Sequence, residues 1–236
     1  MIIVCWFMIL FTLLYEPVIG YLDFQKFKEE VKTNQKARTK FYIHTIVGLW
    51  LPTLLILLCV LFTELTLQDI GLTFPTINTQ PFGPMITYLV LGVALFYFFV
   101  LLYYLIGSHF IVRIRNQFMQ LKEKVIDQVD FTEMLPTNEN ERRLWSYVSI
   151  TAAITEEIIY RGFLIYALAT VFPDLSVGLI VCFASVLFGL AHTYQGLSGV
   201  LKTTIFGLFF SVLYFSFESI LPLMIFHYFI DNFAKL

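Results

Sequence analysis

Charged residues are scarce in this sequence. Asp, Glu, Lys and Arg make up 14% of the 236 residues, whereas 58% are hydrophobic and 26 are phenylalanine. A soluble domain of this length does not need so much apolar surface. The composition therefore excludes an ordinary soluble protein and predicts an all-α integral membrane protein. The net charge of −2 gives no argument for a nucleic-acid partner, and we expect none.

Cysteine is also rare, and its spacing excludes two further classes of protein. Cys5, Cys59 and Cys182 all lie in apolar runs and form no CxxC pair, so we expect packing residues, neither a disulfide set nor metal ligands. The first apolar run lacks the basic leader and small-residue cleavage site of a signal peptide, which predicts a retained helix. Internal repeats of the transporter kind and low-complexity tracts are absent.

What the sequence has in abundance is long apolar runs. A helix of ~20 residues crosses the hydrocarbon core of a bilayer. The runs predict a polytopic transmembrane helix bundle of about seven spans, or eight if an amphipathic linker helix inserts. The predicted spans are Ile2–Tyr21, Phe41–Thr63, Pro84–Ile111, Trp145–Phe172, Ser176–Tyr194, Gly199–Phe217 and Ile220–Phe233.

Basic residues are concentrated in two of the connections. Loops 22–41 and 112–145 carry nearly all of them, and loop 64–83 carries none. The positive-inside rule then places the N-terminus outside and the C-terminus in the cytosol. Apolar residues recur at helical spacing from Ile111 to Val129, so we expect the third span to continue as an amphipathic helix. The lysine-rich stretch Asp23–Lys40 predicts a solvated loop or a short surface helix.

We expect one membrane domain with two parts. Residues 1–144 would hold spans one to three and the amphipathic cytosolic linker, and residues 145–236 would form a catalytic core of spans four to seven.

Three charged residues lie inside the fourth predicted span. Each of Glu156, Glu157 and Arg161 costs on the order of 3 kcal/mol to insert near mid-bilayer. Glu157 and Arg161 are four residues apart and can neutralise each other, which taken alone favours a structural ion pair. Glu156 lies about 100° round the helix without that partner. An unpaired intramembrane carboxylate predicts a functional site.

Polar groups recur in two later spans. His192 ends the fifth, and His227 and Asp231 lie four residues apart in the seventh, where the carboxylate can orient the imidazole. His192 alone would more often be a boundary histidine. The predicted topology, however, places the groups of all three spans between mid-bilayer and the cytosolic face, as a single site requires.

Three motifs, and the order in which they follow one another, resemble those of the CAAX-protease and bacteriocin-processing family of intramembrane proteases. They are Glu156-Glu157-x-x-x-Arg161, Phe188-x-x-x-His192 and His227-x-x-x-Asp231. The flanking Glu141-Arg142-Arg143-Leu144-Trp145 and Arg161-Gly162-Phe163-Leu164 are similar too, and the likeness begins at about Glu139.

The resemblance implies an endopeptidase whose substrate is a membrane-associated peptide or protein at the cytosolic face of the lipid bilayer. Glu156 would activate water with His192, while His227 and the residue four positions on would serve the oxyanion. The chemistry agrees, because a carboxylate buried away from water is a stronger base and donors near the scissile carbonyl stabilise the tetrahedral intermediate.

Asp231 departs from the family pattern, in which this position is often Asn. An ionised Asp231 would repel an oxyanion. Three roles therefore stay open for this residue: a neutral carboxyl group, a partner that orients His227, or a metal ligand. Two histidines and carboxylates are an acceptable Zn²⁺ ligand set. We expect no tightly bound metal, with zinc as the alternative, because no HExxH-type pair lies on one helix.

Two functions of other classes stay open. A proton-coupled transporter also needs buried Glu, His and Asp residues, although it would more often show inverted repeats. A non-enzymatic membrane scaffold or immunity protein is the other alternative, since bacteriocin self-immunity is described within the family.

Overall fold

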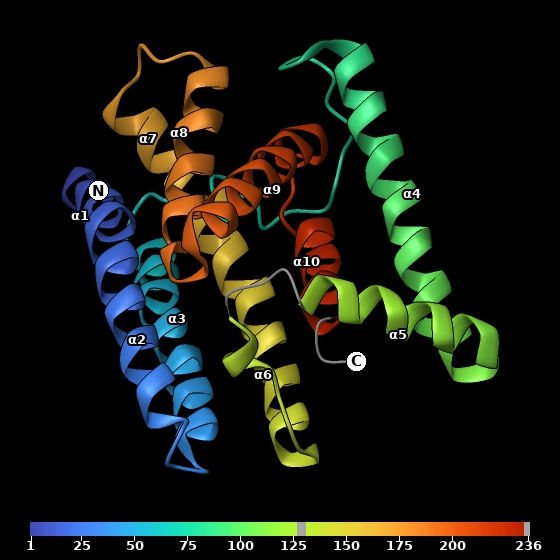
Figure 1. The fold of residues 1–236 in the computed structure, drawn as a ribbon. Helices are drawn as coiled ribbons and strands as arrows, with labels where there is room; N and C mark the ends of the chain where they lie inside the picture. Colours follow the sequence, from blue (N-terminus) through green and yellow to red (C-terminus); the bar gives the residue numbers. More distant parts are fainter. Residues whose placement is uncertain (127–130, 234–236) are drawn as a thin grey trace.

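The computed structural model describes residues 1–126 and 131–233, and every regular element in these two ranges is a helix. The N-terminal helix is built from three consecutive segments, α1 (Ile2–Leu10), the π-helical η1 (Phe11–Gly20) and α2 (Tyr21–Glu30). The chain then returns alongside it as α3 (Ala37–Phe62) (Figure 1). These helices form one side of the bundle.

The middle of the bundle is a second composite helix, made of α6 (Glu139–Glu156), the π-helical η3 (Glu157–Leu164) and α7 (Ile165–Val171). Ile159, Phe163 and Leu164 of η3 are completely buried, in a core shared with Met8 of α1 and Ile56 of α3. Burial of a large aliphatic or aromatic side chain contributes about 1.5–3 kcal/mol. The segment that carries the charged motif is therefore held firmly by apolar packing.

The remaining helices close the bundle on the other side. After α8 (Val177–Leu190) and the short η4 (Thr193–Gln195), α9 (Gly196–Phe217) crosses the bundle obliquely and α10 (Leu221–Phe233) packs along α6 (Figure 1). A Cβ atom on Gly189 would lie 1.9 Å from Thr204 Oγ1, so the absence of a side chain lets α8 and α9 approach closely. This close approach places the end of α8, and with it His192, two residues beyond Leu190.

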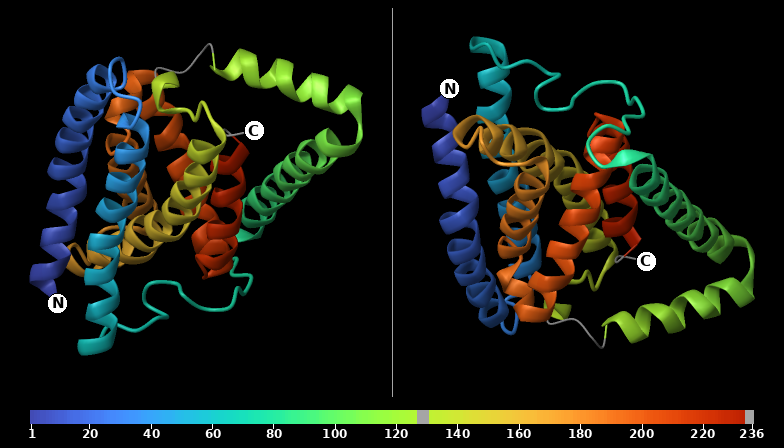
Figure 2. Two further views of the ribbon diagram at one scale, coloured as in Figure 1. Left: turned by 90° about the horizontal axis from the view of Figure 1, so that it is seen from below. Right: turned by 90° about the horizontal axis from the view of Figure 1, so that it is seen from above.

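The next two helices are α4 (Gly83–Phe110), which packs against α9 and α10, and α5 (Val112–Ile126). Figure 2 shows α5 standing away from the bundle and meeting the end of α4 at an angle. The helix bond pattern breaks at Ile111, whose backbone is extended (φ −125°, ψ 113°). The predicted amphipathic helix is present as α5. The prediction that it continues the third span was wrong, because the chain turns at Ile111 and Ile114 packs on Gly107. Val129 of the predicted stripe lies outside the described residues.

The connection between α3 and α4 fixes the start of α10. The amides of Thr76 and Asn78 donate to the carbonyls of Phe217 and Ser216, both at 2.9 Å. Glu218 adopts a left-handed backbone (φ 50°), and its carboxylate accepts from Thr76 Oγ1 and Asn78 Nδ2 at 2.8 and 2.6 Å. The turn from α9 into α10, and with it the placement of His227, is thus fastened to a distant loop.

Four helical stretches of the described chain are long and apolar enough to cross a membrane. They are Ile2–Glu30, Ala37–Phe62, Gly83–Phe110 and Thr193–Phe217. The predicted helical membrane bundle is confirmed. α8 and α10 have 14 and 13 residues, roughly 20 Å of helix. The count of seven spans and the orientation of the C-terminus stay predictions.

The first helix is longer than predicted. It continues past Tyr21 to Glu30, so part of the lysine-rich stretch is helical. Phe24 and Phe27 explain this, since both are buried and Phe27 stacks on Phe41 with ring centroids 4.4 Å apart. Pro17 does not end the helix but lies inside the π-helical stretch η1.

Candidate active site

The charged motif lies where the composite helix changes from α to π geometry. Glu156 is the last residue of α6 and Glu157 the first of η3. Glu157 Oε1 and Arg161 Nη1 are 3.0 Å apart, and the two side chains are 0% and 1% exposed. The predicted ion pair is therefore present and fully buried. The guanidinium also lies over the ring of Phe188, 4.2 Å from its centroid, which adds a cation–π contact.

His227 joins α10 to this ion pair. Its Nδ1 lies 2.7 Å from Glu157 Oε1, the same oxygen that contacts Arg161. Because a carboxylate oxygen accepts, Nδ1 is the donor in this bond. Orienting His227 was one of three roles left open for Asp231, whereas the short bond to the ring comes from Glu157, a contact that spacing along one helix could not indicate.

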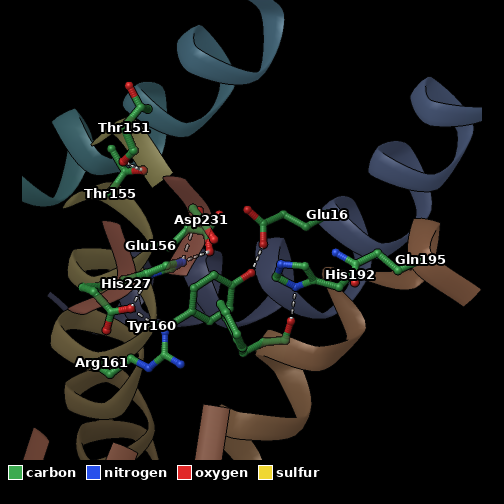
Figure 3. Close-up of polar contacts among 12 residues, drawn as sticks. Glu16, Thr151, Thr155, Glu156, Tyr160, Arg161, His192, Gln195, His227 and Asp231 are labelled. Carbon is green, nitrogen blue, oxygen red and sulfur yellow. Dashed lines mark hydrogen bonds and ion pairs between the residues drawn. The ribbon is translucent and has the colours of Figure 1, made fainter. Parts of the chain in front are cut away.

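The other nitrogen of His227 faces a more open region. Nε2 lies 3.9 Å from Glu156 Oε2 and 3.6 Å from Asp231 Oδ2, both ionic contacts rather than hydrogen bonds. The Glu156 and Asp231 side chains are 14% and 34% exposed. Figure 3 shows the two carboxylates on the same side of the His227 ring. Two carboxylates and one ring nitrogen thus converge where water can enter.

His192 lies beside this cluster rather than within it. Its Nδ1 donates to the Phe188 carbonyl at 2.8 Å, which leaves Nε2 outside that bond. The Phe188 ring packs edge-on against Tyr160, with centroids 5.0 Å apart. In Figure 3 the His192 ring lies on the far side of Tyr160 from His227. Five of the six predicted residues are therefore linked around His227, which contacts Glu156, Glu157 and Asp231, while Arg161 is joined through Glu157. His192 adjoins them through Phe188 and Tyr160.

Two contacts of the site were missed by the sequence analysis. The Tyr160 hydroxyl donates to Glu16 Oε2, and Trp145 Nε1 donates to the Asp231 carbonyl at 3.2 Å. Glu16 carried a usable signal, because it is an acidic residue inside an apolar run, as Glu156 is. Trp145 was visible only as the last residue of the flanking segment that resembles the family, and nothing in that segment indicated a contact with Asp231.

A metal site was tested against the same geometry. Within residues 1–126 and 131–233, no three His, Cys, Asp or Glu side chains are grouped so that they could hold a metal ion. Nδ1 is hydrogen-bonded in both His192 and His227, which leaves only Nε2 of each ring for a metal ion. The residues as arranged do not fit a zinc centre, so no step below goes through a metal, and zinc stays a prediction from ligand types alone.

The comparisons with known proteins concern the second half of the chain. No curated protein and no solved structure matched it. Residues 139–233 match the family model described as type II CAAX prenyl endopeptidase Rce1-like. This segment is less than half of the chain, and it contains all six residues predicted from the three motifs but not Glu16. The match supports a CAAX-type intramembrane endopeptidase function in general terms. Residues 139–233 are therefore similar to the Rce1-like family, in agreement with the resemblance that the three motifs predicted.

Proposed function

We propose that this protein is an intramembrane endopeptidase that hydrolyses a peptide bond near the cytosolic membrane face, with Glu156 as general base. The observation that carries the proposal is the division of the charges around His227. Glu157 holds Nδ1 at 2.7 Å and neutralises Arg161, whereas Glu156 and Asp231 face Nε2 from the accessible side.

Glu156 is the residue suited to activate water. It is partly accessible and has no cation as close as the one that binds Glu157, so its oxygens are free to accept a proton. The resulting hydroxide attacks the scissile carbonyl carbon, and the proton passes from Glu156 to the leaving amine. A positioned general base is worth about 10²–10⁴ in rate.

The two histidines flank the reacting carbonyl in this proposal. His192 donates through Nδ1 to Phe188, so its Nε2 can accept a hydrogen bond from the attacking water and orient it. His227 is fixed at Nδ1, so in its protonated form Nε2–H donates to the developing oxyanion. Asp231, 3.6 Å from Nε2, supports His227 in a neutral or a charged form.

Glu157 and Arg161 act by holding this arrangement. Both are inaccessible to a substrate, and one oxygen of Glu157 connects the guanidinium to the imidazole. Their roles in the proposal are to fix the direction of the His227 ring and to balance charge in a region of low dielectric.

The substrate class can be tested with purified protein in lipid bilayers. Wild-type protein should cleave a membrane-anchored reporter peptide, in a farnesylated or an unprenylated form, with fragments identified by mass spectrometry. Glu156→Ala should abolish cleavage. The matched control is Glu139→Ala, an 81% exposed glutamate on the same helix, which should cleave normally. Equal behaviour of Glu156→Ala and wild type would favour a scaffold instead. Comparative membrane proteomics of a deletion strain would identify natural precursors.

A further inference from the structure

Glu16 comes from a part of the chain that the family match does not cover. It lies in η1, within the π-helical stretch that also contains Pro17. Its Oε2 accepts the hydroxyl hydrogen of Tyr160, 144 residues further along the chain. Figure 3 shows Glu16, Tyr160 and His192 side by side at the centre of the site. A carboxylate inside an apolar helix is costly, and holding two helices together would not require it.

A second hydrogen bond fastens η1 on the other side of the site. Thr193 Oγ1 donates to the Pro17 carbonyl at 2.8 Å, and Thr193 directly follows His192. Cys5 and Met8, earlier in the same helix, are completely buried in the core that contains Ile159. The N-terminal helix is thus fixed to η3 through Glu16 and to the segment of His192 through Pro17.

Tyr160 transmits the position of Glu16 to His192. Tyr160 lies four residues after Glu156 in the composite helix, and its ring packs edge-on against Phe188 at an interplanar angle of 79°. Phe188 in turn contacts the His192 ring, with centroids 4.8 Å apart, and its carbonyl holds Nδ1. The order of contacts is Glu16, Tyr160, Phe188 and His192.

We infer that Glu16 is a positioning residue of the peptidase site, acting through the Tyr160 hydroxyl to fix His192 at its working distance from Glu156. This inference rests on the proposed function and extends the site into the N-terminal helix. This role requires that residue 16 accept a hydrogen bond from the Tyr160 hydroxyl, but it does not require that residue 16 change its protonation state. It also requires the hydroxyl at Tyr160, because the ring alone would retain the apolar contacts but lose its fixed direction.

A double-mutant cycle tests the coupling. Glu16→Ala, Glu16→Gln, Tyr160→Phe and the double variant Glu16→Ala/Tyr160→Phe are assayed for reporter cleavage, normalised to folded protein. Glu16→Ala and Tyr160→Phe should each lower kcat about tenfold with KM little changed, the kinetic equivalent of about one hydrogen bond. The double variant should be no slower than either single variant. Glu16→Gln should recover most of the activity, since its amide oxygen accepts from the hydroxyl.

The control is Thr12→Val, on the same helix one turn before Glu16. Thr12 is buried, and its hydroxyl donates to carbonyls of its own helix, so kcat should not change. Multiplied losses in the double variant, equal losses in Glu16→Gln and Glu16→Ala, or wild-type kcat in Glu16→Ala would each overturn the inference. The variant Glu156→Gln separates a failure of the proposed function from a failure of the role of Glu16. If Glu156→Gln is inactive while Glu16→Ala is fully active, only the role of Glu16 fails. If Glu156→Gln is fully active, the proposed function fails.

Discussion

The two nitrogens of His227 meet different surroundings. On the closed side, Nδ1, Glu157 and Arg161 make contacts of 2.7 and 3.0 Å, and neither partner side chain is more than 1% exposed. On the open side, Nε2 lies 3.9 Å from the Glu156 carboxylate and 3.6 Å from the Asp231 carboxylate, and these side chains are 14% and 34% exposed. The Glu157 carboxylate is therefore held in a buried ion pair on one side, whereas the Glu156 and Asp231 carboxylates on the other side are partly exposed and make only longer contacts.

The difference shows how a costly set of buried charges can serve catalysis. A carboxylate with a close cation is a poor base, because the ion pair stabilises its charged form. The closed side supplies a fixed direction for His227, and the open side supplies partly exposed carboxylate oxygens that are too far from the ring for a hydrogen bond. Each prediction below tests whether the two sides are separate in function.

The largest effect is expected for Glu156→Gln on the open side. The substitution keeps volume and hydrogen bonding but removes the basic oxygen, so kcat should fall by ~10²–10⁴ while the protein still folds and inserts. Cleavage of a reporter peptide by purified protein in detergent, normalised to folded protein, measures it. Wild-type turnover in this variant would remove the functional distinction between the two glutamates.

On the closed side, Glu157→Gln should act mainly on stability. It leaves the Arg161 guanidinium buried without its counter-charge, which costs about 3–5 kcal/mol. Denaturant unfolding in detergent should show this loss, with residual activity per folded molecule. The double variant Glu157→Gln/Arg161→Met removes the unpaired charge as well and should recover part of the stability. An unchanged midpoint in Glu157→Gln would show that the ion pair contributes nothing.

Asp231→Asn should have a small effect, because the amide supplies a donor without a charge next to Nε2. Activity should stay within about tenfold of wild type, since a single hydrogen bond is worth about 1 kcal/mol. Rates and metal content of the purified variant are measured together. Simultaneous loss of activity and of bound zinc would favour the metal alternative.

The smallest effect is expected from an experiment that leaves the site unchanged and tests at which membrane face the open side of His227 lies. The basic loops 22–41 and 112–145 predict a cytosolic C-terminus. A pair of C-terminal fusions, one to a phosphatase that is active outside the cytosol and one to a fluorescent protein that is active inside it, should give fluorescence alone. Phosphatase activity would place the open side at the opposite face.

The sequence indicated most of the helices and the local pairs, because both depend on short spacing. Hydropathy located the apolar runs, and the four-residue interval identified Glu157 with Arg161 and His227 with Asp231. The bond between Glu157 and His227 spans 70 residues and depends on how α10 packs on α6, which no local pattern encodes. The turn at Ile111 was missed because the apolar period continues through it although the backbone does not.

Glu16 was missed for a related reason. Its position in an apolar run was visible, but its partner Tyr160 could be found only after the N-terminal helix was placed against η3. The roles of the six motif residues stay predictions, since the match of residues 139–233 shows a likeness to a family and not the function of each side chain.

The π-helical geometry of η1 and η3 has a consequence for sequence alignment and protein engineering. A π-turn holds one more residue than the α-turn it replaces, and such turns are frequent at functional sites. Glu16 lies in η1 and its partner Tyr160 in η3. Deleting one residue from either stretch would rotate every later side chain of that composite helix by about 100° about its axis. Relatives should therefore tolerate substitutions in these stretches far better than single-residue gaps, and aligners that place gaps there would misassign the site.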